Sequence, residues 1–211
     1  MDICCCKQNM PNEFKHKSAS SLIEYNMDNN ELKQLEEKEL SSKLIYSGTL
    51  LNVYRDEIEL PNGKTTGREY IKHNGAVCIA AMKEDGSVAV ERQFRYPMHR
   101  IVTELPAGKL DTPDEIPLEA AKRELREETG IKASSWTYLG DMIPTCAYST
   151  EIIHMYLAEE LEFGDRDLDE DEFLNVSFMP LRELVDMCMS GEIQDSKTQI
   201  VALKVARIKG I

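Results

Sequence analysis

Residues 108–131 read GKLDTPDEIPLEAAKRELREETGI, and the centre of this stretch has the pattern of an amphipathic helix. Pro117 suits the first turn of such a helix, because the N–H that proline lacks has no helical partner at that position. Apolar side chains then recur at i, i+3 and i+7, and Gly130 suits the residue that ends a helix. The sequence therefore predicts a helix over residues 117–129.

Three carboxylates share one face of this predicted helix. Glu124, Glu127 and Glu128 stand at i, i+3 and i+4, which are neighbouring positions on a helix surface. Like charges at this spacing repel one another unless a cation neutralises them, and hard divalent cations prefer oxygen ligands. The pattern indicates a metal site. A glutamate-rich helix face that is simply solvated is the alternative.

The whole stretch resembles the Nudix box, G-x5-E-x7-R-E-U-x-E-E-x-G-U, in which U is apolar. From Arg123 onward the match is complete. Counting back from Arg123 puts the first glutamate of the box at Glu115, with six residues between Gly108 and Glu115 where the family has five. The extra residue falls in the polar turn 111–114, where an insertion costs little loop entropy. It leaves Asp114 as an alternative to Glu115.

This resemblance implies a hydrolase of nucleoside diphosphate derivatives that uses Mg²⁺, with Mn²⁺ as a substitute. Such ions polarise phosphorus and activate water. The resemblance also implies that Arg123 belongs to the catalytic machinery, where it orients Glu127 and pairs with Glu115. The implied metal ligands are Glu124, Glu127, Glu128 and the carbonyl oxygen of Ala107.

Two segments outside the box resemble the ADP-ribose pyrophosphatase branch of the family, ERQFRYP at 91–97 and ELPAGK at 104–109. The likeness covers nearly all of the chain after Met27 and implies cleavage of ADP-ribose to AMP and ribose 5-phosphate. Arg95, in the first segment, suits substrate binding, because a guanidinium holds phosphate oxygens bidentately. A surface arginine beside a turn is the alternative.

Arg68 and Glu69 match a position where, in this branch, the N-terminal strands of a homodimer help to recognise adenine. The resemblance thus implies a homodimer with exchanged N-terminal strands. A carboxylate accepts hydrogen bonds from an exocyclic amine, so Glu69 is chemically suited to adenine. As a pair on a strand, the two residues equally suit a salt bridge that contributes little.

The acidic segment LDEDEF at 168–173 resembles the loop that carries the catalytic base in this branch. We predict Glu172 as that base, since a carboxylate on a mobile loop can close over the substrate and reach the attacking water. Glu170 is the next candidate. A solvated acidic turn is the alternative without a catalytic role.

The loop TCAYSTE at 145–151 departs from the family, which commonly has a Ser-Pro-Gly run ending in Glu at this position. Without Pro and Gly the backbone freedom differs, so the substrate is the expectation most exposed to this change. Other nucleoside diphosphate sugars or dinucleotides are the alternative substrates. A non-catalytic domain that binds ADP-ribose and an acidic interaction module are alternatives of another class. We interpret residues 193–198 as a structural entry to the last helix.

The remaining periodicities predict an α/β fold, a Nudix α/β/α sandwich with a mixed sheet, preceded by a small N-terminal β-meander. Hairpin turns are expected at 61–63 and 84–86, and Pro106 should break the chain into a loop. We expect a flexible extension over 1–26, N-terminal strands for dimerisation and substrate contacts over 27–73, and the Nudix domain over 74–211. The predicted strands cover 44–54, 57–60, 68–72, 76–82, 88–94, 101–105, 137–143, 152–160 and 176–179, and two further helices cover 181–189 and 196–208.

Composition excludes several classes of partner. The 211 residues carry 25 Lys plus Arg against 38 Asp plus Glu, a formal net charge of −13, which disfavours nucleic acid and anionic membranes. A small phosphorylated substrate remains compatible, because bound cations invert the local field. Three of the six cysteines are adjacent, unlike a disulfide framework, and neither a signal peptide nor a membrane-length apolar run is present. We expect a reduced, cytoplasmic protein.

Overall fold

A computed structural model of the chain describes residues 32–168 and 173–211. The predicted extension over residues 1–26, its boundary at Met27, and the two candidate bases Glu170 and Glu172 lie outside the described residues.

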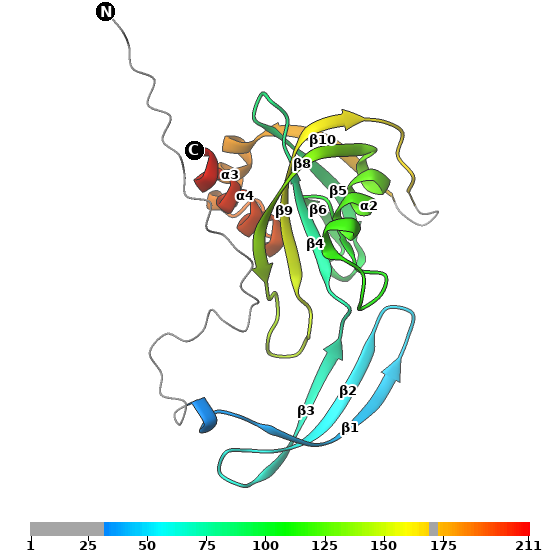
Figure 1. Ribbon diagram of the computed structural model, residues 1–211, viewed down its shortest axis with the longest axis vertical. Coiled ribbons are helices and arrows are strands. Elements are labelled where there is room, and N and C mark those ends of the chain that lie inside the picture. The colour runs from blue at the N-terminus through cyan, green and yellow to red at the C-terminus, as the bar shows by residue number, and fades with distance from the viewer. Residues whose placement is uncertain (1–31, 169–172) are drawn as a thin grey trace, which may run out of the picture.

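The central sheet has the strand order β7 (Ala107–Lys109), β4 (Ala76–Ala81), β9 (Ile153–Phe163) and β8 (Ile131–Met142). It is mixed, because β4 and β9 run parallel while the other neighbours are antiparallel. Helix α2 (Pro117–Thr129) packs on one face, and α3 (Leu181–Ser190) and α4 (Ser196–Lys209) cover the other (Figure 1). The predicted α/β/α sandwich is confirmed.

Strand β4 lies at the centre of the hydrophobic core, and all six of its residues are buried. Successive side chains of a strand point to opposite faces. Val77 and Ile79 accordingly join the cluster that includes Leu125 of α2, whereas Cys78 joins the cluster that includes Val201 of α4. This burial on both faces explains why AVCIAA reads as a continuous apolar run.

A second sheet, antiparallel, has the order β10 (Leu174–Pro180), β5 (Ser87–Arg95) and β6 (Arg100–Glu104). The short 3-10 helix η2 (Tyr96–Met98) joins β5 to β6. In the hairpin of β5 and β6, Arg95 pairs with Arg100 and Glu104 pairs with Glu91, and the long side chain of Arg95 reaches along the sheet to Glu104.

The N-terminal strands form a third sheet that projects from the rest of the protein (Figure 1), with β1 (Lys38–Ser47), β2 (Asn52–Glu59) and β3 (Thr65–Lys72). The prediction of one strand over 44–54 and another over 57–60 is wrong, because the chain turns at residues 48–51, where the N–H of Gly48 donates to the carbonyl of Leu51 at 2.9 Å. All ten residues of β1 are exposed, so no inward-facing periodicity marks this strand in the sequence.

Two boundaries near the box also differ from the prediction. Residues 107–109 form the short strand β7 and not a loop, because they pair with β4, where Ala107 lies opposite Cys78. Strand β8 begins at Ile131, directly after the C-cap of α2, and not at Thr137. In both cases a neighbouring strand imposes the extended conformation on residues whose own sequence pattern does not.

Helix α2 begins and ends at the predicted residues, with Pro117 in the first turn and Gly130 as C-cap at φ 72°. We expect Gly130→Ala to lower the free energy of unfolding more than Gly191→Ala does. Both caps are left-handed, which costs a residue with a Cβ roughly 1–2 kcal/mol. A Cβ on Gly130 would also lie 2.3 Å from the carbonyl oxygen of Gly164, whereas one on Gly191 meets nothing within 4 Å. Urea unfolding of both variants measures the difference, and equal midpoints would contradict this account.

Candidate active site

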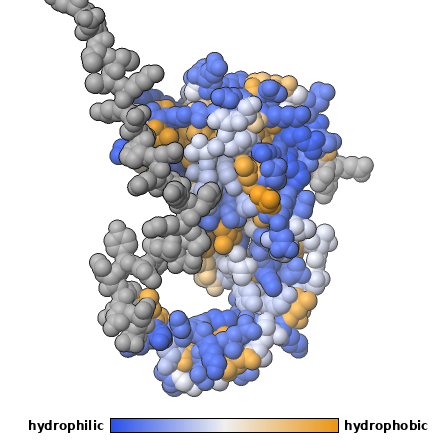
Figure 2. All heavy atoms as spheres, in the orientation of Figure 1, coloured by the Kyte–Doolittle hydropathy of each residue, from blue (hydrophilic) through white to orange (hydrophobic). Residues whose placement is uncertain are grey.

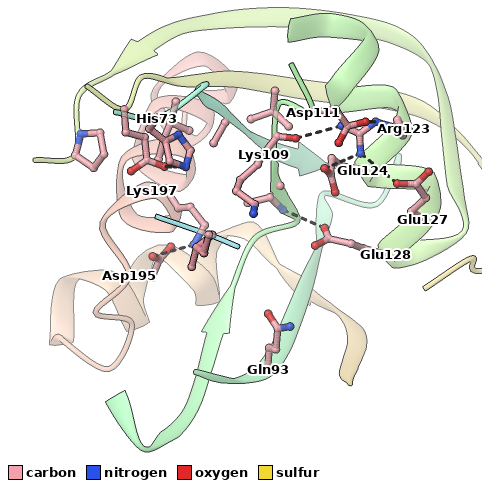
Figure 3. A pocket seen from close by; sticks show the side chains of 18 of the residues that line it. His73, Gln93, Lys109, Asp111, Arg123, Glu124, Glu127, Glu128, Asp195 and Lys197 are labelled. Atoms are coloured by element: carbon pink, nitrogen blue, oxygen red, sulfur yellow. Dashed lines mark hydrogen bonds and ion pairs between the residues drawn. The ribbon is translucent and has the colours of Figure 1, made fainter. Parts of the chain in front are cut away.

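A pocket of about 810 Å³ is lined by residues of α2, of the start of α4 and of the segment that joins β3 to β4. Figure 3 shows Arg123, Glu124, Glu127 and Glu128 of α2 on one side and His73, Asp195 and Lys197 on the other. The pocket therefore joins one wall rich in carboxylates to a second wall that carries cations.

The glutamates of the first wall are held in place by the backbone of β7. Glu128 is buried, and its Oε2 accepts a hydrogen bond from the N–H of Ala107 at 3.1 Å. Glu124 lies so close to Gly108 that a Cβ on this glycine would stand 2.0 Å from Cδ of the glutamate. Gly108 thus leaves the space that the carboxylate of Glu124 occupies.

Arg123 binds the acidic residues of the box together. Its guanidinium lies 2.8 Å from Glu124, 3.3 Å from Glu127 and 3.2 Å from Glu115, and it donates to the carbonyl oxygen of Lys109 at 3.1 Å. Partial burial lowers the pKa of Arg123, but the surrounding carboxylates outweigh this effect and raise it. The geometry selects Glu115 over Asp114 as the box acid that pairs with this arginine.

The donor set of this wall suits a hard divalent cation. Glu124, Glu127 and Glu128 supply carboxylate oxygens from one helix, and such oxygens are the ligands that Mg²⁺ and Mn²⁺ prefer. In the arrangement described for residues 32–168 and 173–211, no three acidic, His or Cys side chains converge closely enough to chelate an ion. In this arrangement Arg123 contacts Glu124 and Glu127, and the N–H of Ala107 contacts Glu128, so a bound ion would compete with these contacts for the carboxylate oxygens.

The second wall contains four charged residues in contact with one another. Arg95 donates to Glu104 twice, through Nε at 2.6 Å and through an Nη at 3.0 Å. Lys197 donates both to Glu104 and, at 3.0 Å, to Asp195. Burial opposes ionisation of Glu104, but Arg95 and Lys197 lower the pKa of Glu104 below its ordinary value.

This second wall adds two observations to the sequence interpretation. Arg95 does line the pocket, but two of its N–H groups are committed to Glu104 and not directed at open space. Residues 193–198 lead into α4, where Asp195 accepts from the N–H of Thr198 as N-cap, and within this segment Lys197 also lines the pocket. Glu104 and Lys197 are 93 residues apart, so no local signal links them.

A third wall comes from the junction between β3 and β4. The imidazole Nε2 of His73 lies 3.9 Å from a carboxylate oxygen of Glu151, and both residues line the pocket. The N–H of His73 donates to Oγ1 of Thr150, and the N–H of Ile71 donates to the carbonyl of Tyr148, each at 2.9 Å. The unusual loop 145–151 is therefore fastened to the end of the N-terminal sheet.

The structure does not bring Arg68 and Glu69 into this pocket. Arg68 pairs with Glu37, and Glu69 lies 3.6 Å from Arg55 on the neighbouring strand. Both pairs lie on or beside the N-terminal sheet. Within one chain these two residues are therefore not combined with the glutamates of α2.

The acidic loop after β9 reaches the pocket at its first residues. The N–H of Asp167 donates to the carbonyl of Glu127 at 3.1 Å, and Asp167 lines the pocket. The sequence interpretation passed over Asp167 in favour of Glu170 and Glu172, which follow it by three and five residues. The hydrogen bond shows that this loop begins against the carboxylate helix.

Two families match consecutive parts of the chain. The NUDIX domain matches residues 72–202, and the nucleoside diphosphate sugar hydrolase N-terminal domain matches residues 37–71. The first match covers the pocket walls built by α2, β5 and α4. The second covers most of the N-terminal sheet.

Several characterised relatives share most of the chain. An ADP-ribose pyrophosphatase of Bacillus subtilis is 41% identical over 79% of this chain and 91% of its own length. A methanol dehydrogenase activator of Bacillus methanolicus is 36% identical over 80% and 91%, and an ADP-ribose pyrophosphatase of Mycobacterium tuberculosis is 36% identical over 74% and 77%.

Among solved structures, an ADP compounds hydrolase has the same fold, with a TM-score of 0.73 at 23% identity over 83% of this chain and 95% of that chain. Within the described ranges 32–168 and 173–211, no helix is long and apolar enough to cross a membrane. With its box helix, its sandwich fold and these matches, the chain belongs to the Nudix family.

Proposed function

We propose that this protein hydrolyses the pyrophosphate bond of ADP-ribose and releases AMP and ribose 5-phosphate. The observation that carries the proposal is the pairing of two opposite walls in one pocket, carboxylates on α2 and cations at Arg95 and Lys197. Because a diphosphate is dianionic, it is held best by positive charge on both sides. A cation bound to the carboxylates of α2 would supply this charge on one side, and Arg95 and Lys197 supply it on the other. Relatives named ADP-ribose pyrophosphatase support the choice of substrate.

We propose Mg²⁺, with Mn²⁺ as a substitute, as the cation of the first wall. Glu124, Glu127, Glu128 and the carbonyl oxygen of Ala107 would hold it. When bound, such an ion polarises the phosphoryl oxygens and makes water a better nucleophile at neutral pH. Arg123 contributes by fixing the carboxylates of Glu124 and Glu127, to which it already donates.

The substrate and the attacking water need further groups. Arg95 is the proposed ligand of the diphosphate, through the N–H groups that Glu104 does not use. Glu172 is the proposed general base, with Glu170 as the alternative, because the acidic loop that carries both begins at the pocket with Asp167. Both glutamates lie outside the described residues.

We further propose a homodimer in which residues 27–73 make the dimer contacts and bring Arg68 and Glu69 to the partner's pocket. Within residues 32–168 and 173–211, the N-terminal sheet and the turn between β1 and β2 expose apolar side chains, visible at several places on this surface in Figure 2. Residues 1–26 would be an extension, and 74–211 the Nudix domain. Among the described cysteines, Cys78, Cys146 and Cys188 are free, which supports a cytoplasmic location. The exposed apolar side chains of β1 and of the turn between β1 and β2 are Leu40, Leu44, Ile45, Tyr46, Leu50 and Leu51.

A second candidate substrate class is another nucleoside diphosphate sugar or a dinucleotide. The departure of loop 145–151 from the family pattern favours it, and so does a relative named GDP-mannose pyrophosphatase in Yersinia enterocolitica, 33% identical over 67% of this chain. A non-catalytic ADP-ribose-binding domain is less well supported, since the box retains every glutamate.

Turnover of ADP-ribose measured beside ADP-mannose, ADP-glucose, GDP-mannose, NADH and diadenosine polyphosphates tests the proposal. With Mg²⁺ present, we expect the largest kcat/KM for ADP-ribose and the products AMP and ribose 5-phosphate. A larger kcat/KM for a hexose or dinucleotide substrate would move the assignment to the second class. Binding of ADP-ribose without turnover of any compound would identify a non-catalytic domain.

A further inference from the structure

Arg95 is the proposed ligand of the diphosphate, yet it is paired bidentately with a carboxylate. An arginine and a glutamate that contact each other in this way cancel most of each other's charge, so the pair alone offers little attraction to a phosphate. The cluster of four charged residues on the second wall, Arg95, Glu104, Asp195 and Lys197, contains a second cation that changes this balance of charge. It is Lys197, which contacts the same carboxylate as Arg95.

Burial divides the four charges of this cluster into an inner and an outer part. The side chain of Glu104 is 6% exposed, that of Lys197 14% and that of Asp195 18%, whereas that of Arg95 is 42% exposed. Two cations and two carboxylates make the cluster neutral as a whole. Its one well-exposed member is therefore a cation at the pocket.

The contacts show how this arrangement is maintained. Glu104 uses one oxygen for Nε of Arg95 and shares the other between Arg95 and Lys197. Asp195 holds Lys197 through one oxygen and caps α4 through the other. Lys197 is thus fixed at the start of a helix, where its ammonium group offsets the charge of a carboxylate from a distant strand.

We propose that Lys197 is a positioning residue for the diphosphate, because it neutralises Glu104 and so leaves the positive charge of Arg95 to the substrate. Glu104 supplies the geometry, since its two oxygens orient the guanidinium, and Lys197 supplies the compensating charge. The inference rests on the proposed function of the pocket. It assigns Lys197 a role that acts through Glu104 and not through direct contact with the substrate.

Removing the ammonium group should weaken substrate binding more than the chemical step. In Lys197→Met, Arg95 alone must offset Glu104 and Asp195, and the cluster becomes net negative. We expect KM for ADP-ribose to rise about tenfold, the size of one lost charge-assisted contact, while kcat changes less than about twofold. Lys209→Met is the matched control. It lies on the same helix and also leaves a carboxylate, Glu159, without its cation, but outside the pocket, and its KM should stay unchanged.

A double-mutant cycle with Glu104→Gln separates positioning from direct contact. Glutamine keeps an acceptor for Arg95 but removes the charge that Arg95 and Lys197 share, and the remaining carboxylate, Asp195, is balanced by Arg95 once Lys197 is removed. We therefore expect Lys197→Met to change KM by less than about twofold in the Glu104→Gln background. If Lys197→Met raised KM about tenfold in the Glu104→Gln background as well, the two effects would be additive. Lys197 would then contact the substrate directly, and the proposal would be overturned. An unchanged KM in the single variant would overturn it as well.

The same cycle is measured as binding of magnesium pyrophosphate by calorimetry, which does not depend on turnover of ADP-ribose. The wild-type protein and its variants could show the expected coupling between Lys197 and Glu104 in pyrophosphate binding, while the wild type does not hydrolyse ADP-ribose. This result would contradict the proposed function but support the role of Lys197. Circular dichroism identifies a temperature at which each variant is folded. Where Lys197→Met alone does not fold, the comparison of Glu104→Gln with the double variant still decides between coupling and additivity.

Discussion

Glu128→Gln should lower kcat for ADP-ribose hydrolysis by on the order of 10³-fold, since an ion that polarises phosphorus contributes several kcal/mol to the barrier. Glu128 is the buried carboxylate of the box face. Glutamine keeps its volume, and the amide oxygen can still accept from the N–H of Ala107, which Glu128 now binds at 3.1 Å. The substitution therefore removes a charge from the proposed metal site while leaving the packing between α2 and β7. Steady-state kinetics over a range of Mg²⁺ concentrations measure the effect.

Glu119→Gln is the matched control for this prediction. Glu119 lies on the same helix, is exposed and pairs with Lys122 at 2.8 Å, an arrangement that contributes little to stability. We expect wild-type kcat and an unchanged melting temperature for this control. A Glu128→Gln enzyme with near-normal turnover would remove Glu128 from the metal site.

Gly108→Ala should lower kcat by about 10²-fold without unfolding the protein. A Cβ at this position would stand 2.0 Å from Cδ of Glu124 and 2.1 and 2.3 Å from its two oxygens. The carboxylate is the far end of a flexible side chain and can swing aside, so the cost falls on the site and not on the fold. Displacing one proposed metal ligand should cost less than removing the charge of the buried Glu128, and a loss of this size is typical of a single misplaced electrostatic group.

The second variant needed for this prediction is Glu124→Ala. If Gly108→Ala acts only by displacing the carboxylate, it should have almost no further effect on kcat when that carboxylate is already absent. The melting temperature of Gly108→Ala should stay close to that of the wild type, since Gly to Ala in an unstrained position also reduces the entropy of the unfolded chain. A large drop in melting temperature, or a full additional loss of kcat in the double variant, would contradict the steric explanation.

The carboxylate wall is the part of the site that the sequence predicts well. Residues 117–129 form the helix that their periodicity and capping residues indicate, and the spacing of Glu124, Glu127 and Glu128 places them on its pocket side. The pairing of Arg123 with Glu115 also follows from the box. Because of the inserted residue, the sequence allows Asp114 as an alternative partner, and the contact at 3.2 Å identifies Glu115. All these groups lie within one short segment, where helix geometry relates sequence spacing to position.

The contacts within the cationic wall are the part of the site that the sequence does not predict. Arg95 was predicted to bind the substrate, and residues 193–198 were interpreted as a structural entry to the last helix. The structure joins both to Glu104, a residue 9 positions from Arg95 and 93 from Lys197. Neither the commitment of the arginine nor the presence of the lysine follows from any pattern near either residue.

The sequence by itself determined the carboxylate helix, the sandwich fold and the diphosphate chemistry that the box implies. Only the tertiary structure decided that residues 107–109 are a strand, that Lys197 shares Glu104 with Arg95, and that Arg68 and Glu69 lie away from the pocket of their own protomer. The physical reason is the range of the interactions. Helix periodicity and capping act within a few residues and leave a mark in the sequence, whereas strand pairing and buried ion clusters join residues that only the folded chain brings together.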